Sequence, residues 1–459
     1  YKKTVSIVNE TATGMYESLV GDKKGFLLES YDKNYDRYTF FGKEPEEIIS
    51  SRGNALVITK NDGTQEVRNG NPLERLKEYY SEFDIVKDNE ELSFSGGLVG
   101  NLGYDFVRYA EVLPDNNPDE IGIETVQMML MTKFIMVDHV AETLTGIILG
   151  EDTPEGRKKS LEEAEELIRQ ELANKGRAPE KNFTHDGVIV NQSDSLEQYS
   201  QKVEKIKEYI REGHIFQTVL SQRWTIETKQ SGFELYKELR ELNPSPYLYY
   251  FNYGDFEVIG SSPEMIVKQQ GNRVYTCPIA GTRKRGADAE EDALLRDELL
   301  QDEKERAEHV MLVDLARNDM GRISEFGTVK VTQFMEVQNY SHVMHIVSMV
   351  EGRKKGEFHL VSSFLPAGTL SGAPKIRAME IIDELESVRR GLYGGATGYI
   401  DFSGDMDFCI TIRTMIKKGK RVYLQAGAGI VADSIPENEY QECCNKVMAL
   451  AKTLMHYIH

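Results

Sequence analysis

Two pairs of glutamates at helical spacing are the side chains of this sequence that most directly suggest chemistry. Glu305 and Glu308 lie in the charged run 302–309, and Glu439 and Glu442 lie near the end of the chain. Residues three apart on a helix share a face, so each pair would project two carboxylates in one direction. Glu308 would lie at the edge of the buried face, where a carboxylate needs a partner such as a divalent cation. The alternative is a solvated acidic helix, which runs of this composition more often form.

Four further residues are of types that act on substrates. Gln217 lies in an apolar row of an expected strand, and Glu264 follows a proline that restricts its backbone. His345 lies in the alternating segment 341–348, and Arg413 lies in an apolar expected strand, where a buried guanidinium needs an anionic partner. Taken alone, Gln217 and His345 are more often structural residues, so their value depends on the whole set.

Glycine-rich segments could supply backbone N–H groups to a carboxylate. Gly281 and Thr282 precede a short basic run, and Gly427-Ala428-Gly429 lies in a second such segment. The loop 366–375 leads into an expected helix at 376–385, whose first N–H groups could also bind an anion. Short glycine turns are common, so these segments are supporting observations only.

The composition narrows the possible partners. A net charge of −20, with one short basic run at 283–285, argues against nucleic acid and anionic membranes as partners. The four cysteines have neither zinc-ligand spacing nor the pattern of a disulfide framework. Nothing resembles a signal peptide or a membrane-spanning helix, so we expect a cytoplasmic protein.

The order of patterns divides the chain into two regions. Residues 1–150 are rich in short apolar runs typical of strands, and a charged helix is expected at 154–173. The polar segment 174–191 that follows is the best boundary, so we expect an N-terminal region at 1–180 and a second region at 190–459. Capping boxes are expected at Asp194 with Glu197 and at Ser434 with Glu437. The first would begin a helix that ends before Gly213, followed by a strand at 214–220.

Several motifs occur together in one order. They are Pro-Ile-Ala-Gly-Thr-Arg from 278, Asp-Glu-Lys-Glu-Arg-Ala-Glu-His from 302, Asp-Leu-Ala-Arg-Asn-Asp from 314, Ala-Gly-Ala-Gly from 426 and the Glu-x-x-Glu pairs. With these motifs the chain resembles the chorismate-utilising enzymes, and among them the anthranilate synthase large subunits. The resemblance covers residues 190–455 strongly and the N-terminal part more loosely. It implies an α+β fold with large antiparallel sheets in a sandwich-like core, flanking helices, and an N-terminal region packed on the catalytic body.

The resemblance also implies roles for individual residues. Glu264 would protonate the departing C4 hydroxyl, His345 would serve the loss of pyruvate, and Thr282 and Gln217 would complete the catalytic set. Magnesium would be held by Glu308 and Glu442, with Glu305 and Glu439 as supporting acids. The positions that match chorismate-binding residues are Gly281, Thr282, Tyr393, Arg413, Gly427, Ala428 and Gly429.

The implied reaction is magnesium-dependent amination of chorismate at C2 and elimination of pyruvate to give anthranilate, the first committed step of tryptophan biosynthesis. Relatives that make isochorismate carry a lysine base where Gln217 stands, and a neutral amide cannot serve as a base. Many aminodeoxychorismate synthases carry lysine where Ala280 stands, so that activity, which supplies folate synthesis, is the alternative. A non-catalytic amino-acid-sensing subunit is a third hypothesis, which the proton donor and the paired acids disfavour.

Partners and regulation follow from the same resemblance. No segment resembles a glutamine amidotransferase, so a separate amidotransferase subunit would supply ammonia, and the resemblance implies a heterotetramer. The runs 27–30 and 243–248 match elements that bind tryptophan as a feedback inhibitor. The expected tryptophan site consists of Glu29, Ser30, Pro246, Tyr247 and Leu248.

Overall fold

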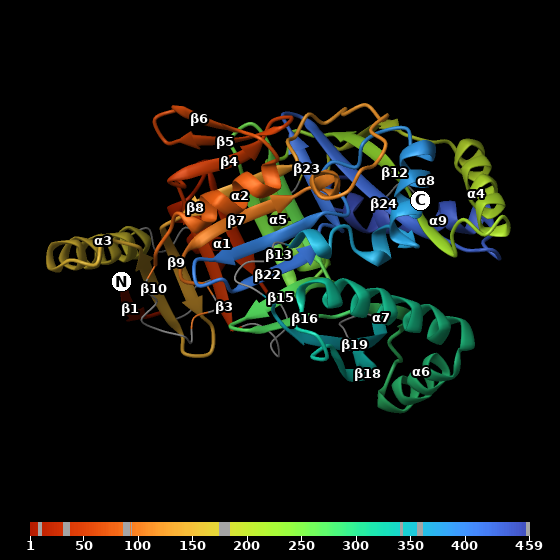
Figure 1. The fold of residues 1–459 in the computed structure, drawn as a ribbon. Coiled ribbons are helices and arrows are strands. Elements are labelled where there is room, and N and C mark those ends of the chain that lie inside the picture. The colour runs from red at the N-terminus through yellow and green to blue at the C-terminus, as the bar shows by residue number, and fades with distance from the viewer. Residues whose placement is uncertain are drawn as a thin grey trace.

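Two large antiparallel sheets form the centre of the protein in the computed structural model (Figure 1). The structure describes residues 1–7, 12–30, 37–85, 92, 94–173, 184–339, 343–355 and 361–455. Each sheet has 12 strands, and all of their pairings are antiparallel. The expected α+β class with large antiparallel sheets and flanking helices is therefore confirmed.

The first sheet has the order β1-β10-β9-β3-β2-β13-β14-β23-β24-β12-β11, with β20 on β12. Its strands are β1 (Lys2–Ser6), β2 (Gly25–Glu29), β3 (Tyr38–Lys43), β9 (Lys133–Asp138), β10 (Thr143–Ile148), β11 (Val188–Gln192), β12 (Gln217–Glu227), β13 (Tyr247–Asn252), β14 (Glu257–Ser262), β20 (Gly372–Ala373), β23 (Thr414–Lys418) and β24 (Arg421–Ile430).

The second sheet has the order β17-β19-β16-β15-β22-β21-β7-β8-β4-β5-β6, with β18 on β19. Its strands are β4 (Glu47–Ser51), β5 (Ala55–Lys60), β6 (Gln65–Asn69), β7 (Gly97–Leu102), β8 (Val126–Met131), β15 (Met265–Gln270), β16 (Arg273–Thr276), β17 (Ile279–Lys284), β18 (Lys330–Asn339), β19 (Val343–Arg353), β21 (Ala396–Asp401) and β22 (Met406–Ile410).

Helices cover the outer faces of both sheets. Those on the first sheet are α1 (Ala12–Leu19), α3 (Pro154–Ala173), α4 (Leu196–Arg211), α5 (Gly232–Leu242), α8 (Lys375–Leu385) and α9 (Pro436–Ala451). The second sheet is covered by α2 (Pro72–Ser81), η1 (Tyr104–Tyr109) and α7 (Glu303–Ile323), with α6 (Ala289–Gln301), η2 (Val361–Ser363) and η3 (Gly368–Leu370) nearby. None of the described helices combines the length and apolar character that crossing a bilayer requires.

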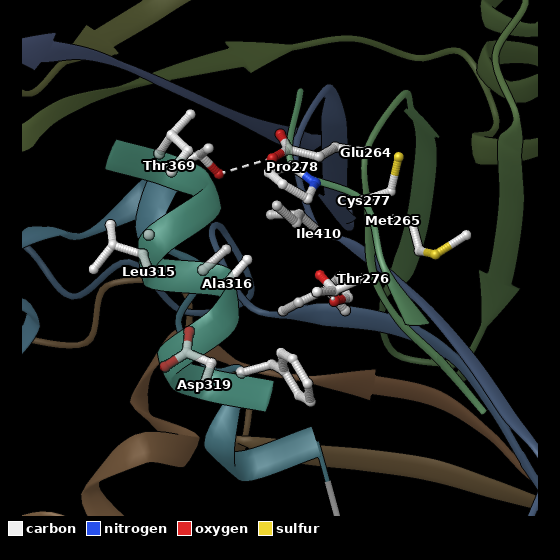
Figure 2. A pocket seen from close by; sticks show the side chains of 15 residues that line it. Glu264, Met265, Thr276, Cys277, Pro278, Leu315, Ala316, Asp319, Thr369 and Ile410 are labelled. Carbon is white, nitrogen blue, oxygen red and sulfur yellow. Dashed lines mark hydrogen bonds between the residues drawn. The ribbon is translucent and has the colours of Figure 1, made fainter. Parts of the chain in front are cut away.

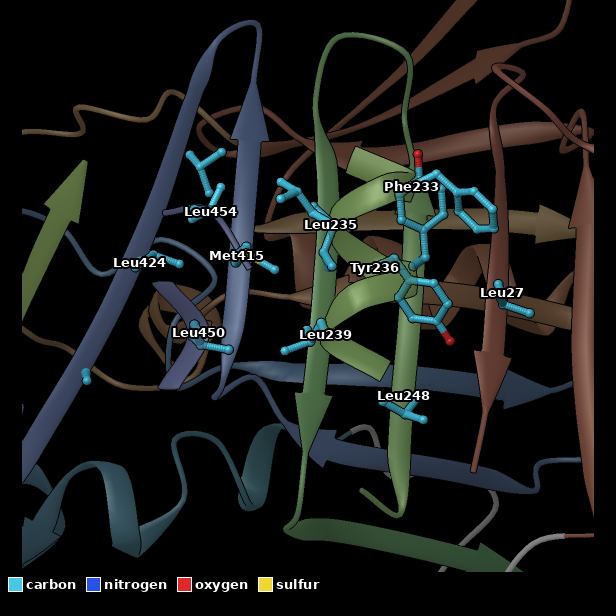
Figure 3. Packing of buried hydrophobic residues seen from close by; sticks show 14 of the residues in the cluster. Leu27, Phe233, Leu235, Tyr236, Leu239, Leu248, Met415, Leu424, Leu450 and Leu454 are labelled. Carbon is cyan, nitrogen blue, oxygen red and sulfur yellow. The ribbon is translucent and has the colours of Figure 1, made fainter. Parts of the chain in front are cut away.

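Strands buried on both faces explain the short apolar runs of the sequence. In β13, Leu248 and Tyr250 belong to the core beneath the helices, whereas Tyr249 and Phe251 belong to the core between the sheets. This alternation follows from the period of two of a strand. Figure 3 shows side chains of α5 lying over strands of the first sheet, where they form the helix-covered core. The result is a four-layered arrangement of helices, sheet, sheet and helices.

Both sheets continue across the two regions expected from the sequence. In the first sheet β2 pairs with β13, and in the second sheet β7 pairs with β21. Each pairing joins a strand from before the charged helix α3 to one from after it. Residues 174–183 of the expected boundary lie outside the described residues, and the division at 180–190 remains a prediction.

Several local expectations need correction. The capping box of α4 is formed by Ser195 and Gln198, because Asp194 instead binds Lys202. The helix α9 begins after Ile435 without a side-chain cap, since the Ser434 hydroxyl accepts a hydrogen bond from the Val431 N–H. The strand expected at 214–220 begins only at residue 217 and continues to 227. In contrast, α3 has the expected bounds.

Candidate active site

The candidate site lies where the chain changes from one sheet to the other. The turn after β14 carries Glu264 into the second sheet, and the segment after β22 carries Arg413 back into the first. The two crossovers are bonded together: the Ile410 N–H donates to the Glu264 carbonyl at 2.9 Å. Arg413 was expected inside a strand, but it has φ +50° in the break between β22 and β23. A chain that leaves one sheet for the other must bend, and this bend turns Arg413 out of the strand pattern.

Glu264 faces a small cavity of about 40 Å³ between the crossover, α7 and η3 (Figure 2). This volume has room for water, since about 10–15 Å³ suffices for one water molecule. The hydroxyl of Thr369 donates to Oε1 of Glu264 at 3.0 Å. Burial raises the pKa of Glu264 to about 7, and the Thr369 bond and the Lys446 charge oppose the rise. A carboxyl with this pKa retains its proton over much of the neutral range and can donate it.

His345 is held in one orientation by a bulge in the neighbouring strand. The register of β17 on β19 shifts between Ala280 and Thr282, and Gly281 there has φ +70°, a conformation that favours glycine. Nδ1 of His345 is 2.9 Å from the Gly281 carbonyl and 3.1 Å from the Thr282 hydroxyl. A carbonyl can only accept, so Nδ1 carries the proton and Nε2 carries the lone pair. Burial lowers the pKa of His345, which keeps the ring neutral and able to act as a base.

The paired acids of α7 and α9 lie close enough to influence each other. Burial raises the pKa of Glu308, and the charges of Glu305 and Glu442 raise it further. Burial and Glu442 likewise raise the pKa of Glu439. These acids therefore form one cluster of unfavourable negative charge, which a cation would relieve.

The carboxylates have the donor chemistry that magnesium prefers, since hard oxygen ligands suit it. Among the described residues, however, no three acidic, histidine or cysteine side chains are arranged to enclose an ion. The ammonium of Lys446 forms a 2.7 Å ion pair with Glu442 and donates to the Gly427 carbonyl at 2.9 Å. Lys446 thus supplies one of the charges that balance the cluster.

The remaining expected residues come from different segments: Gln217 from β12 and Gly429 from β24 of the first sheet, and Tyr393 from the turn before β21. Gln217 is buried, its Oε1 has no hydrogen-bond partner among the described residues, and its Nε2 lies 2.6 Å from where a Cβ of Gly429 would stand. A larger residue at 429 would therefore force this amide to move. Burial lowers the pKa of Arg413, and its charge acts on both Tyr393 and His345. Arg413 thus lies near Tyr393 and His345, and Gln217 lies near Gly429.

Thr369 and Lys446 were not expected from the sequence. Lys446 is four residues after Glu442 on α9, a spacing that brings opposite charges together on a helix, so this signal was available. Thr369 had no such signal, because its contact with Glu264 spans 105 residues.

The segments expected to bind tryptophan are neighbours in the first sheet. Leu248 is opposite Glu29 in the pairing of β13 with β2, and Leu248 is buried in the helix-covered core. The carboxylate of Glu29 accepts hydrogen bonds from Tyr236 and from Arg240 of α5. These bonds hold the carboxylate in place beneath α5.

The chain is similar to proteins of one enzyme family. The chorismate binding enzyme family matches residues 26–452. Anthranilate synthase component 1 of Acetivibrio thermocellus is 44% identical over 458 residues, covering 97% of this chain and 93% of its own. That of Aquifex aeolicus (strain VF5) is 42% identical, covering 93% and 88%. The crystal structure of anthranilate synthase component I from Streptococcus pneumoniae TIGR4 has a TM-score of 0.79 at 39% identity, covering 91% and 92%. The menaquinone-specific isochorismate synthase MenF of Escherichia coli shares the fold, with a TM-score of 0.72 at 17% identity over 99% and 95%.

The titration of Glu264 predicts a pH-dependent stability. The folded state holds the proton up to a pKa of about 7, whereas the unfolded chain releases it near 4.5. The free energy of unfolding should therefore fall as pH rises through this window, by on the order of 3 kcal/mol from this group. Urea titrations between pH 4.5 and 8 should show a smaller fall in Glu264→Gln than in the unchanged protein.

The control is Glu303→Gln, an exposed acid in the first turn of α7. The free energy of unfolding of this variant should depend on pH in the same way as that of the unchanged protein. Equal pH dependence in Glu264→Gln and the unchanged protein would show that Glu264 has an ordinary pKa.

Proposed function

The chain belongs to the chorismate-binding enzyme family, and we propose that it is component I of an anthranilate synthase, which converts chorismate and ammonia to anthranilate, pyruvate and water. The observation that carries the proposal is the buried carboxyl of Glu264, whose pKa of about 7 lets it hold a proton at neutral pH. Relatives named anthranilate synthase component 1 that cover more than nine-tenths of the chain support the same reaction.

The first half-reaction needs an acid and no protein base. Ammonia attacks C2 of chorismate, both double bonds of the ring shift by one position, and the C4–O bond breaks. Glu264 gives its proton to the departing hydroxyl, which leaves as water. Gln217 cannot deprotonate a water molecule, so ammonia, which already carries a lone pair, is the effective nucleophile.

The second half-reaction removes a proton and pyruvate from the aminated intermediate. His345 is suited to this step because its Nδ1 is fixed by the Gly281 carbonyl and its ring is neutral. Nε2 can therefore accept a ring proton as the C3–O bond breaks and the ring becomes aromatic. The enolpyruvyl group leaves as the enolate of pyruvate, which takes up a proton to become pyruvate.

Substrate binding explains how a protein of net charge −20 takes up a dianion. Arg413, together with the Gly281 and Gly427–Gly429 segments, would receive one carboxylate. Magnesium held by Glu308 and Glu442, with Glu305 and Glu439 in support, would supply a positive centre for the other. Thr282 and Tyr393 would complete the walls, with Ala428 between the two glycines.

Aminodeoxychorismate synthase remains the second candidate, and the product decides between the two. A separate amidotransferase subunit would deliver ammonia, and tryptophan bound near Glu29 would inhibit. These two features extend the proposal and do not carry it.

Activity should appear when the chain is mixed with chorismate, magnesium and an ammonium salt. Anthranilate fluorescence should rise, and Glu264→Gln should lower kcat by about 100-fold or more, because the leaving hydroxyl loses its acid. Glutamine should not replace ammonium. A product that keeps its pyruvyl group, seen by mass spectrometry, would favour the alternative activity, and turnover of Glu264→Gln at the unchanged rate would refute the acid role.

Magnesium should bind without substrate. At about 100 times its dissociation constant, a ligand of the folded state adds about 2.7 kcal/mol to the free energy of unfolding. Glu308→Gln and Glu442→Gln should lose this stabilisation and most of the activity. Glu303→Gln should keep both. Stabilisation by magnesium that is equal in all four proteins would exclude the acid cluster as its site.

Tryptophan should inhibit through the β2–β13 segment. Ser30→Phe fills the space beside Glu29, so inhibition should weaken by about 10-fold or more, in line with a coupling of 1–3 kcal/mol. The measurement is the tryptophan concentration that halves chorismate turnover. Ser81→Phe, at the exposed end of α2, is the matched control and should be inhibited like the unchanged protein. Equal inhibition of both variants would place the tryptophan site elsewhere.

A further inference from the structure

A buried ion pair joins the segments that surround the site. Arg390 and Glu386 have side chains that are 1% and 3% exposed. Nε of Arg390 donates to Oε2 of Glu386 at 2.9 Å, and Nη2 donates to Oε1 at 2.7 Å. The pair is therefore bidentate, the strongest geometry for these groups.

The same two side chains bind the backbone of two other segments. Arg390 donates to the Leu370 carbonyl at 2.6 Å and to the Val219 carbonyl at 2.8 Å. Glu386 accepts from both the N–H and the hydroxyl of Ser221, each at 2.8 Å. The pair thus connects the end of α8, the η3 segment and β12.

Each connected segment carries a residue of the candidate site. Leu370 follows Thr369, which donates to Glu264, and Val219 is two residues from Gln217 on β12. The guanidinium of Arg390 also lies 5.7 Å from the centre of the Tyr393 ring and 4.6 Å from that of Tyr104. The Arg390 guanidinium is therefore in contact with segments that hold Glu264, Gln217 and Tyr393, three residues of the candidate site.

Stability alone is a poor explanation of this pair. Removing two charges from water is costly, and apolar residues in place of a buried ion pair are often as stable or more so. A bidentate pair does fix the relative placement of what it binds, because its hydrogen bonds are directional. In this protein, what it binds is the backbone next to Thr369 and Gln217.

We propose that Arg390 and Glu386 are positioning residues that hold Thr369 against the Glu264 carboxyl. The inference rests on the proposed function of Glu264 as the acid. Arg390 does not contact the substrate in this proposal. It holds the Leu370 carbonyl, and the neighbouring Thr369 donates its hydrogen bond to the Glu264 carboxyl. Loss of the pair lets η3 move, and the Thr369 hydroxyl then withdraws from Glu264.

The titration of Glu264 measures this directly. The groups that face it are Cys277 from the β16–β17 turn, Asp319 from α7, Lys446 from α9 and Thr369. The Thr369 bond lowers the pKa of Glu264, so losing it should raise that pKa, by about one unit or less. Infrared titration can follow the protonated carboxyl, identified as the band that Glu264→Gln lacks. This readout needs no turnover.

The test is a double-mutant cycle. Arg390→Lys keeps the charge but cannot reach Glu386 and both carbonyls, and Thr369→Val removes the hydroxyl alone. Both single variants should raise the pKa of Glu264 and shift the alkaline limb of the kcat–pH profile to higher pH by the same amount, with a smaller change in KM. In the double variant the pKa of Glu264 should rise no further than in Thr369→Val, because both changes remove the same hydrogen bond from Thr369 to Glu264. Additive shifts, or an unshifted titration in Arg390→Lys, would overturn the proposal.

A second pair of variants separates positioning from general destabilisation. Glu386→Gln keeps an acceptor for Ser221 but weakens its hold on Arg390, and it should raise the Glu264 pKa in the same direction. Lys202→Met breaks another, partly buried ion pair, with Asp194; the two side chains are 18% and 4% exposed. It should lower the melting temperature and leave the Glu264 titration unchanged. If Lys202→Met shifted the pKa of Glu264 as much as Glu386→Gln does, the effect would come from general destabilisation, and the positioning role would be refuted. If the unchanged protein does not turn over chorismate, the proposed function fails, and the infrared result still decides the positioning role.

Discussion

The packing of two sheets face to face is the constraint on which the site depends. Strands that pass between the sheets must bend, and a bend exposes polar backbone that needs partners. The two crossovers supply these partners to each other, since the Ile410 N–H donates a hydrogen bond to the Glu264 carbonyl and the Ser261 N–H donates one to the Arg413 carbonyl. Glu264 and Arg413, the proposed proton donor and anion receptor, therefore lie on segments that these hydrogen bonds join.

Burial then determines the chemistry that these residues can perform. The same loss of water raises the pKa of Glu264 and lowers that of His345, so an acid is kept protonated and a base is kept neutral. Groups with opposite roles can thus work at one pH. Burial thus moves the two pKa values in opposite directions. The hydrogen bond that Thr369 donates adjusts the pKa of Glu264, and the hydrogen bond that the Gly281 carbonyl accepts orients His345.

The acid cluster shows how a strongly negative protein can receive an anion. The glutamates of α7 and α9 repel one another, and the positive charge of Lys446 offsets only part of this repulsion. A cluster in this condition favours binding of a cation, and a bound cation reverses the sign of the local field. Arg413 would supply a second positive charge, so the proposed site could attract both carboxylates of the substrate.

The sequence alone determined the fold class and the helix of the first acid pair, because these follow from local periodicity and from motifs in one order; the roles of the site residues stay predictions. The bounds of α3 and the strand that carries His345 followed in the same way. It did not determine the break at Arg413 or the contacts of Thr369, Glu386 and Arg390. Those depend on which strands meet when two sheets close on each other, across separations such as the 105 residues between Thr369 and Glu264, and no local pattern records such pairings.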